Sequence, residues 1–373
     1  MTTSKNKKPT DGDKKDFRST LGQDIRAVFS VPVNGARDPC ELWTAVAPTL
    51  GELTGGLVGR SFKPQRDIGD LSGKVILITG GNTGLGKETI LELARHNPSR
   101  IYLAARTESK ARDAIKSIHD ELSKSSSSQP VDIQYIQLDL ASFPSIKAAA
   151  AQFTLENTRL DRLVLNAGIM GEAAVTTPQG HEIQFGTNHV GHFLLTKLLL
   201  PTLLKTATAD GGSADVRVVS VSSVGNNLAP AGNGLFETMT STEKLLGLST
   251  WQRYGVSKAA NILFAMELAR RHPEIKAVAV HPGVVSTALY DGTRQSNLTA
   301  RYFLAPTMKL AFRSPQSGAL SQLWAVAGAR QEELVNGGYY TPVGYQITRN
   351  RFLKERDLAQ KLWDWTDKEV ERV

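Results

Sequence analysis

Residues 74–86, KVILITGGNTGLG, decide the fold that we expect. The first six residues form a short apolar, β-branched run, which is typical of a strand buried on both faces of a parallel sheet. Glycines follow at once, and the stretch from Lys87 to His96 then has the pattern of an amphipathic helix. A strand, a tight glycine turn and a helix in direct succession are the opening unit of an α/β domain.

The rest of the chain repeats this alternation. A helix is expected from Ser109 to Leu122, and the apolar helix of the chain begins near Val190. Further short apolar runs predict strands at 101–105, 133–138, 163–165, 216–221 and 277–280. Strands that alternate with helices predict an α/β fold, a Rossmann-like doubly wound parallel sheet in a single domain with an N-terminal extension.

Three segments are expected along the chain. Residues 1–70 carry scattered glycine, proline and charge without a sustained period, so we expect a partly disordered extension, with a short helix between Leu42 and Val58. Residues 71–345 form the domain, and 346–373 form a helical tail packed on it.

Composition excludes several classes of protein. The chain has 373 residues, a formal net charge of +8 and one cysteine, Cys40, which excludes an internal disulfide. The basic residues are dispersed and are not interleaved with aromatic ones, so we expect no nucleic-acid partner. We also expect no metal site.

No membrane span is expected, because no window of about 20 residues is uninterruptedly apolar. The most apolar stretch, Val190–Leu204, contains His192, Lys197 and Pro201 and is interpreted as a buried core helix. The lysine-rich start lacks the apolar region of a signal peptide. These features favour a cytoplasmic location, and peripheral membrane association through residues 1–70 stays open.

The glycine turn predicts a dinucleotide site. Its pattern is T-G-x-x-x-G-x-G, starting at Thr79, and it stands directly between a strand and a helix. Glycines there let the backbone approach a pyrophosphate, and the helix N-terminus supplies N–H groups and partial positive charge. The residues expected to bind the cofactor here are Gly80, Asn82, Thr83, Gly84, Leu85 and Gly86.

The end of the second expected strand indicates which dinucleotide. A carboxylate at that position would bind the ribose 2′-hydroxyl of NAD. Arg106 stands there instead, and its planar guanidinium suits a 2′-phosphate, with Lys110 and Arg112 nearby on the next helix. We therefore expect NADP(H) as the cofactor, the alternative being that Arg106 is a solvated loop residue.

Tyr254 and Lys258 are the main candidates for chemistry. Four residues apart, they share one face of a helix. A phenol has an ordinary pKa of about 10, and a neighbouring ammonium lowers it toward neutrality by favouring the phenolate. Such a pair also occurs often by chance as an exposed helical pair, so it needs support from other residues.

That support stands at other expected strand ends. The strand at 216–221 runs into two serines, of which Ser223 is preferred over Ser222 to hydrogen-bond a substrate oxygen. The segment Asn166-Ala167-Gly168 ends another strand at the same rim. Asn188 opens the apolar helix and would hold a water that relays protons to Lys258, or else is a buried structural amide.

Together these residues resemble the short-chain dehydrogenase/reductase family over residues 71–345. The resemblance implies that Asn188, Ser223, Tyr254 and Lys258 form a catalytic tetrad. It also implies that Asp139 contacts adenine. It assigns the nicotinamide carboxamide to Pro282 and Gly283 with Thr287, and the nearby cofactor contacts to Asn166, Ala167, Gly168, Tyr254 and Lys258.

Longer motifs are similar to one branch of this family. Residues 186–193, GTNHVGHF, and 254–261, YGVSKAAN, resemble retinol-dehydrogenase-like and WW-domain-oxidoreductase-like members, and the tail resembles fungal ones. The stretch between Ser223 and Tyr254 is longer than in compact members and is expected to wall the substrate pocket. The resemblance also implies a homodimer or homotetramer formed through the helices at 190–204 and 254–268.

The function expected is an NADP(H)-dependent oxidoreductase that interconverts a carbonyl and a primary or secondary alcohol on a small apolar substrate, with Tyr254 as general acid and base. Pocket positions expected to be apolar are Ile169, Met170, Leu228, Leu289 and Tyr290. The alternative is a non-catalytic NADP(H)-binding sensor or interaction protein.

Overall fold

Strand β1 (Val75–Thr79) lies in the middle of the sheet in a computed structural model, which describes residues 61–124, 131–212, 214–283, 285 and 314–372. All five of its residues are buried, as the uninterrupted apolar run predicts. It pairs in parallel with β2 (Arg100–Ala105) on one side and with β4 (Arg162–Leu165) on the other.

The described sheet has eight strands in the order β3-β2-β1-β4-β5-β6-β7-β8. The remaining strands are β3 (Ile133–Gln137), β5 (Arg217–Val221), β6 (Lys276–Val280), β7 (Tyr339–Thr341) and β8 (Tyr345–Ile347). Only the last pairing, β7 with β8, is antiparallel. Because the chain leaves β3 and returns to the far side of β1, the strand order reverses between β1 and β4, where ligands bind in such sheets.

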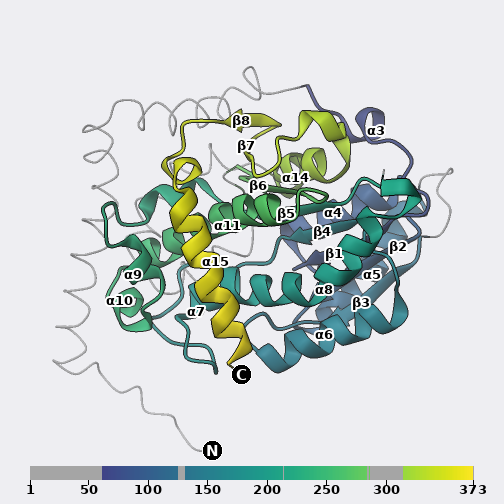
Figure 1. Ribbon diagram of the computed structural model, residues 1–373. Helices are drawn as coiled ribbons and strands as arrows, with labels where there is room; N and C mark the ends of the chain where they lie inside the picture. The colour runs from purple at the N-terminus through teal and green to yellow at the C-terminus, as the bar shows by residue number, and fades with distance from the viewer. Residues whose placement is uncertain (1–60, 125–130, 213, 284, 286–313, 373) are drawn as a thin grey trace, which may run out of the picture.

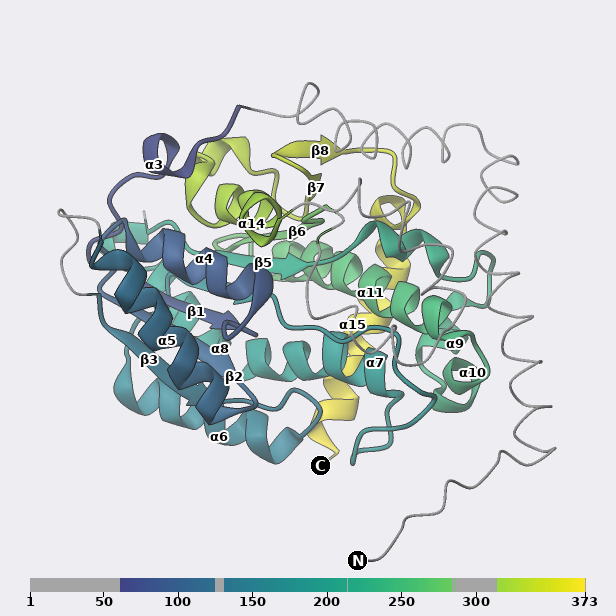
Figure 2. The ribbon, with the colours of Figure 1, turned by 180° about the vertical axis from the view of Figure 1, so that it is seen from behind.

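Helices cover both faces, which confirms the predicted doubly wound fold (Figures 1 and 2). One face carries α6 (Phe143–Glu156), α8 (Gly191–Ala207), α11 (Thr250–Arg271) and α15 (Arg356–Glu371). The other carries α4 (Gly84–Ala94), α5 (Glu108–Leu122) and α14 (Pro315–Leu323).

Short helices connect these elements. They are α3 (Pro64–Asp67), α7 (Ile183–Phe185), the π-helix η1 (Gly186–Val190), η2 (Asp210–Gly212), η3 (Val224–Leu228), α9 (Leu235–Met239), α10 (Thr242–Leu246), the π-helix η6 (Trp324–Gly328), η7 (Gln331–Glu333) and η8 (Arg351–Lys354). The π-helix η1 runs directly into α8, so that one continuous helical segment contains Asn188.

The predicted strands lie where expected, to within one or two residues. The segments around β7 and β8 were not predicted as strands, because three residues are too few to reveal an alternating pattern. Strand β8 also spans the expected boundary at 345/346. Phe62 and Ile68, from the expected extension, are buried in the domain core. Residues 1–60 lie outside the described part of the chain, including the helix expected between Leu42 and Val58.

Helix α15 packs across α8 and α11 (Figure 1). Trp363 stacks with its ring centroid 5.8 Å from that of Phe264 and meets Phe193 edge-on at 4.7 Å. Around these rings, Lys197 of α8 pairs with Asp367 at 2.6 Å and Arg271 of α11 pairs with Asp364 at 2.5 Å. The tail thus covers part of the two helices that the resemblance assigns to subunit contacts.

Among the described residues, no helix is both long and apolar enough to cross a membrane.

Leu362 anchors α15 and provides a stability test. It is 1% exposed, so Leu362→Ala should lower the free energy of unfolding by about 2–4 kcal/mol through lost burial and a residual cavity. Urea denaturation followed by circular dichroism measures this. The neighbouring exposed Lys361→Ala is the control and should change the free energy by less than about 0.5 kcal/mol. Equal effects from both variants would show that α15 adds little to the core.

Candidate active site

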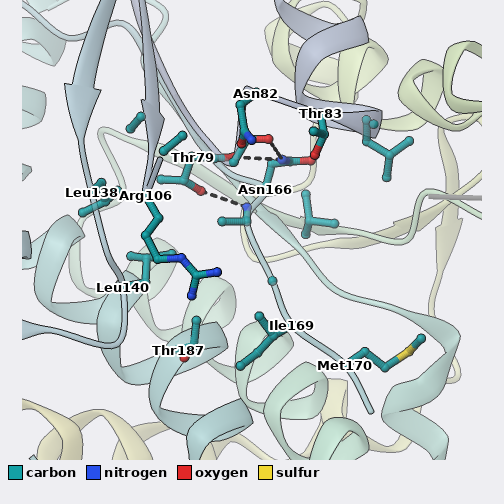
Figure 3. A pocket seen from close by; sticks show the side chains of 18 of the residues that line it. Thr79, Asn82, Thr83, Arg106, Leu138, Leu140, Asn166, Ile169, Met170 and Thr187 are labelled. Atoms are coloured by element: carbon teal, nitrogen blue, oxygen red, sulfur yellow. Dashed lines mark hydrogen bonds between the residues drawn. The ribbon is translucent and has the colours of Figure 1, made fainter. Parts of the chain in front are cut away.

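A cavity of about 390 Å³ opens at the carboxyl ends of the parallel strands, at the switch point between β1 and β4 (Figure 3). It brings together most of the residues predicted from the sequence. Those that line it are Gly80, Asn82, Thr83, Gly84, Leu85, Arg106, Asp139, Asn166, Ala167, Gly168, Ser223, Tyr254, Lys258, Pro282 and Gly283. Gly86 and Asn188 lie behind the wall, and Thr287 is outside the described residues.

The glycine turn is shaped by close backbone approach. Gly80 has a φ of +68°, and a Cβ there would come within 2.9 Å of the Ala167 Cα. A Cβ on Gly86 would collide with the Gly80 carbonyl. Only glycine avoids both conflicts, so the turn packs tightly against the segment that follows β4.

Side chains fasten this contact. The Asn166 Nδ2 donates to the carbonyl oxygens of Thr79 at 2.8 Å and Gly80 at 3.3 Å, and the Ala167 N–H donates to Thr79 Oγ1 at 2.9 Å (Figure 3). The amide side chain of Asn166 is therefore used to hold the turn. The first N–H groups of α4 stay at the cavity, where an anion would meet the positive end of the helix.

Positive charge gathers at the β2 end of the cavity. Arg106 and Lys110 both line it, and both are exposed to solvent. Figure 3 shows the Arg106 side chain extending from the end of β2 over the cavity. Lys110 was noted in the sequence but not chosen as a site residue. It lies in the first turn of α5, and Arg106 lies in the connection between β2 and that helix.

Tyr254 and Lys258 lie on the buried face of α11. Their exposed fractions are 6% and 3%, and the Lys258 Nζ stands 5.6 Å from the centroid of the tyrosine ring. Burial lowers the pKa of Lys258 to about 8, because the charged form is poorly solvated there. Its Nζ donates to the Val221 carbonyl at 2.9 Å, which fixes the ammonium beside the end of β5.

The two serines after β5 differ in what their hydroxyls do. The Ser222 hydroxyl donates to the Lys258 carbonyl at 2.7 Å and so serves the contact between β5 and α11. The Ser223 Oγ accepts a hydrogen bond from the Gly225 N–H at 3.1 Å, which leaves its own hydrogen available. A Cβ on Gly225 would come within 2.9 Å of the Tyr254 ring and 3.3 Å of Ser223 Oγ, so Ser223 and Tyr254 converge where this glycine leaves room.

Asn188 is fully buried in the π-helix η1 and acts as a clip. Its side chain exchanges two hydrogen bonds with the backbone of Ile169, at 2.8 and 3.0 Å, and its Nδ2 also donates to Ser257 Oγ at 2.9 Å. A Cβ on Gly168 would lie 3.3 Å from both Asn188 Oδ1 and Lys258 Nζ. Asn188 thus joins the wall of the cavity to the turn of α11 that carries Lys258.

Arg253, Glu182 and Thr250 form a polar clamp on the loop around Glu172, which was not recognised in the sequence. The buried Arg253, one residue before Tyr254, forms an ion pair with the buried Glu182 at 3.0 Å. Its Nη2 donates to the Glu172 carbonyl at 2.7 Å, and Thr250 Oγ1 donates to the same carbonyl at 3.0 Å. The clamp fixes the cavity-lining loop next to the catalytic candidate, and its members are too far apart in sequence to be linked by a motif.

The substrate end of the cavity differs in part from the expectation. Ile169 and Met170 line it, as predicted, and so does Val285. Leu228 does not, and neither does any other residue from 224 to 253, so the wall predicted for the long stretch before Tyr254 is not found there. That stretch instead forms η3, α9 and α10. Leu289 and Tyr290 lie outside the described residues.

Comparison with known proteins gives consistent results. The sequence pattern of the short chain dehydrogenase family matches residues 74–236. An uncharacterized oxidoreductase of Schizosaccharomyces pombe is 37% identical over 87% of this chain and 92% of its own length. Mouse retinol dehydrogenase 12 is 36% identical over 79% of this chain and 85% of its own length.

Solved structures share the fold. An uncharacterized protein from Mycobacterium paratuberculosis superposes with a TM-score of 0.60 at 26% identity, covering 84% of this chain and 98% of that one. An NADPH-bound carbonyl reductase from chicken fatty liver gives a TM-score of 0.53 at 21% identity, covering 76% and 97%, and supports the fold alone. The chain therefore belongs to the short-chain dehydrogenase family, in its retinol-dehydrogenase-like branch, and is an oxidoreductase that uses a nicotinamide cofactor.

Proposed function

We propose that this oxidoreductase uses NADP(H) to interconvert a carbonyl and an alcohol on a small apolar substrate, with Tyr254 as general acid and base. The observation that carries the proposal is the convergence of Ser223, Tyr254 and Lys258 at one end of a cavity whose other end is the glycine turn. A hydrogen-bond donor, a phenol and a buried ammonium in one pocket suit a reaction in which charge develops on a substrate oxygen.

The cavity fits a dinucleotide. The glycine turn lines the cavity and α4 begins at its edge, so a pyrophosphate there would meet the positive end of the helix. We assign the pyrophosphate to the turn and the adenine to the neighbourhood of Asp139. The residues assigned to the nicotinamide end are Asn166, Ala167, Gly168, Tyr254, Lys258, Pro282 and Gly283, together with Thr287.

The preference for NADP(H) over NAD(H) follows from charge. Arg106 and Lys110 offer two cations where the adenosine ribose of a cofactor on this turn would lie. No carboxylate among the described lining residues comes from the end of β2, where one would bind a free 2′-hydroxyl. A guanidinium can grip a phosphate through two parallel hydrogen bonds, which favours the phosphorylated cofactor.

The residues divide the chemical work among them. Ser223 donates a hydrogen bond to the substrate oxygen and holds it beside the Tyr254 hydroxyl. Tyr254 gives its proton to that oxygen in the reductive direction and takes one in the oxidative direction. Lys258, whose Nζ donates to the Val221 carbonyl, stabilises the phenolate with its positive charge. Asn188 holds the backbone of Ile169 in the cavity wall. The bound cofactor supplies or accepts the hydride.

An apolar substrate fits the described lining at this end, where Ile169, Met170 and Val285 contribute hydrocarbon surface. The relatives named retinol dehydrogenase support the same class. A homodimer or homotetramer through α8 and α11 would have to accommodate α15, which covers part of both. A cytoplasmic location, the absence of a nucleic-acid partner and peripheral membrane binding through residues 1–70 remain predictions.

Replacing the catalytic phenol should separate chemistry from binding. Tyr254→Phe should lower kcat for NADPH-dependent reduction of an apolar aldehyde or ketone by about 10²–10⁴-fold, because the proton donor is lost. The Kd for NADPH, measured by fluorescence titration, should change by no more than about twofold. Ser222→Ala is the control, because it removes another hydroxyl that lines the cavity and leaves the proposed proton donor in place. An unchanged rate in Tyr254→Phe would exclude Tyr254 as the proton donor, whereas NADPH binding without turnover in the wild-type protein would favour a non-catalytic role.

Reversing the charge at the end of β2 should change cofactor choice. Arg106→Asp should weaken NADPH binding by about 10–100-fold and strengthen NADH binding, since a carboxylate repels the 2′-phosphate and accepts from a 2′-hydroxyl. Arg112→Asp is the control, because Arg112 is exposed on α5, six residues beyond Arg106, but does not line the cavity. If Arg106→Asp has the same Kd for NADPH and the same Kd for NADH as Arg112→Asp, the assignment of NADP(H) is wrong.

A further inference from the structure

His192 is a buried, titratable side chain to which the proposed mechanism assigns no role. It stands in the first turn of α8, one turn beyond Asn188, and is 3% exposed. Its two ring nitrogens contact two different parts of the site. Nε2 lies 2.9 Å from Thr79 Oγ1, at the end of β1, and Nδ1 lies 3.0 Å from the carbonyl oxygen of Asn188.

The partners define which nitrogen carries the proton. A backbone carbonyl can only accept, so Nδ1 must be the protonated nitrogen. Burial lowers the pKa of His192 to about 4, so the ring is neutral near pH 7 and Nε2 is an acceptor. The Thr79 hydroxyl therefore donates to Nε2, while its oxygen accepts the Ala167 N–H at 2.9 Å. Its other acceptor, the Val164 carbonyl, is farther away at 3.4 Å.

We propose that His192 is a positioning residue that couples the cofactor turn to the catalytic side of the cavity. This inference rests on the proposed function, because it concerns how the glycine turn, assigned to NADP(H), and the proposed catalytic tetrad are held in position relative to each other. The contact of Nε2 with Thr79, called the Thr79 arm below, orients the Thr79 hydroxyl, which bonds the end of β1 to Ala167. The contact of Nδ1 with the Asn188 carbonyl, called the Asn188 arm, holds the backbone of Asn188.

The Asn188 arm reaches the chemistry through two further contacts. Asn188 fixes the backbone of Ile169, which lines the cavity, and donates to Ser257, the neighbour of Lys258 in α11. A movement of the η1 backbone would therefore shift a cavity wall and the turn carrying Lys258 together. A rigid imidazole with one donor and one acceptor fits this task, because it spans the two elements without a rotatable bond between its nitrogens.

Two substitutions separate the arms. The side-chain amide of asparagine ends near the position of Nδ1, so His192→Asn keeps the bond to the Asn188 carbonyl and loses the one to Thr79. The longer glutamine ends near Nε2, so His192→Gln keeps an acceptor for Thr79 and loses the bond to Asn188. Both variants leave a polar group in the same buried space, and each is the control for the other.

The first readout needs no cofactor. Amide hydrogen exchange in the full-length protein without ligand reports on the Ala167 N–H for the Thr79 arm and on the Ile169 N–H for the Asn188 arm. His192→Asn should speed exchange at Ala167 by about tenfold, and His192→Gln should do so at Ile169, each through one weakened buried hydrogen bond. Unchanged exchange at Ala167 in His192→Asn overturns the proposal, even if the protein binds no NADPH.

The second readout is functional. His192→Asn should raise the Kd for NADPH by about 5–10-fold, whereas His192→Gln should act mainly on kcat and lower it by about tenfold. Thr79→Val, which removes only the hydroxyl, should raise the Kd as His192→Asn does, and the double variant should not exceed the larger single effect by more than about twofold. Parallel changes of Kd and kcat in both histidine variants, together with a lower melting temperature, would reduce His192 to a packing residue. Failure of the wild-type protein to bind NADPH would overturn the proposed cofactor instead.

Discussion

The close approach between the end of β1 and the segment after β4 is the constraint on which the site depends. Gly80 stands against the backbone of Ala167, and Asn166 holds the carbonyls of Thr79 and Gly80. This contact lies where the strand order reverses, so it forms the floor of the cavity and the start of α4 together. A side chain at Gly80 would press on the backbone of Ala167, and one at Gly86 would press on the Gly80 carbonyl, so either would push these segments apart.

Burial is the second determinant of the site. Because α11 lies against the sheet over most of its length, Tyr254 and Lys258 are held in a medium that solvates charge poorly. Such a medium lowers the pKa of Lys258 and strengthens the electrostatic interaction between these two buried side chains. The carbonyl of Val221 and the tight contact at Gly225 then fix the distance of these groups from Ser223. The geometry of the proposed catalytic group therefore depends on how the backbone around it packs.

Two buried polar side chains, Asn188 and Arg253, link separate segments around the cavity in a similar way. Asn188 joins η1 to the segment after β4 and to α11, and Arg253 joins α11 to the loop at Glu172. Each of these side chains bonds to the backbone of a cavity wall and to one side chain of another element. Such contacts satisfy buried carbonyls and N–H groups and also fix the walls of the cavity, since a buried polar group left unpaired would be costly.

The sequence by itself determined the fold class, the place of the glycine turn and most of the residues around the cavity. These features depend on local chemistry: an apolar β-branched run predicts a buried strand, glycines predict a turn without side chains, and two residues four apart share a helical face. Only the tertiary structure decided what depends on contacts between distant segments. It distinguished the roles of the Ser222 and Ser223 hydroxyls, placed Lys110 at the cavity, moved the stretch before Tyr254 away from its lining, and showed the bonds of His192 and Arg253. No sequence pattern marks those partners, because a hydrogen bond between residues a hundred positions apart is set by how the helices pack on the sheet.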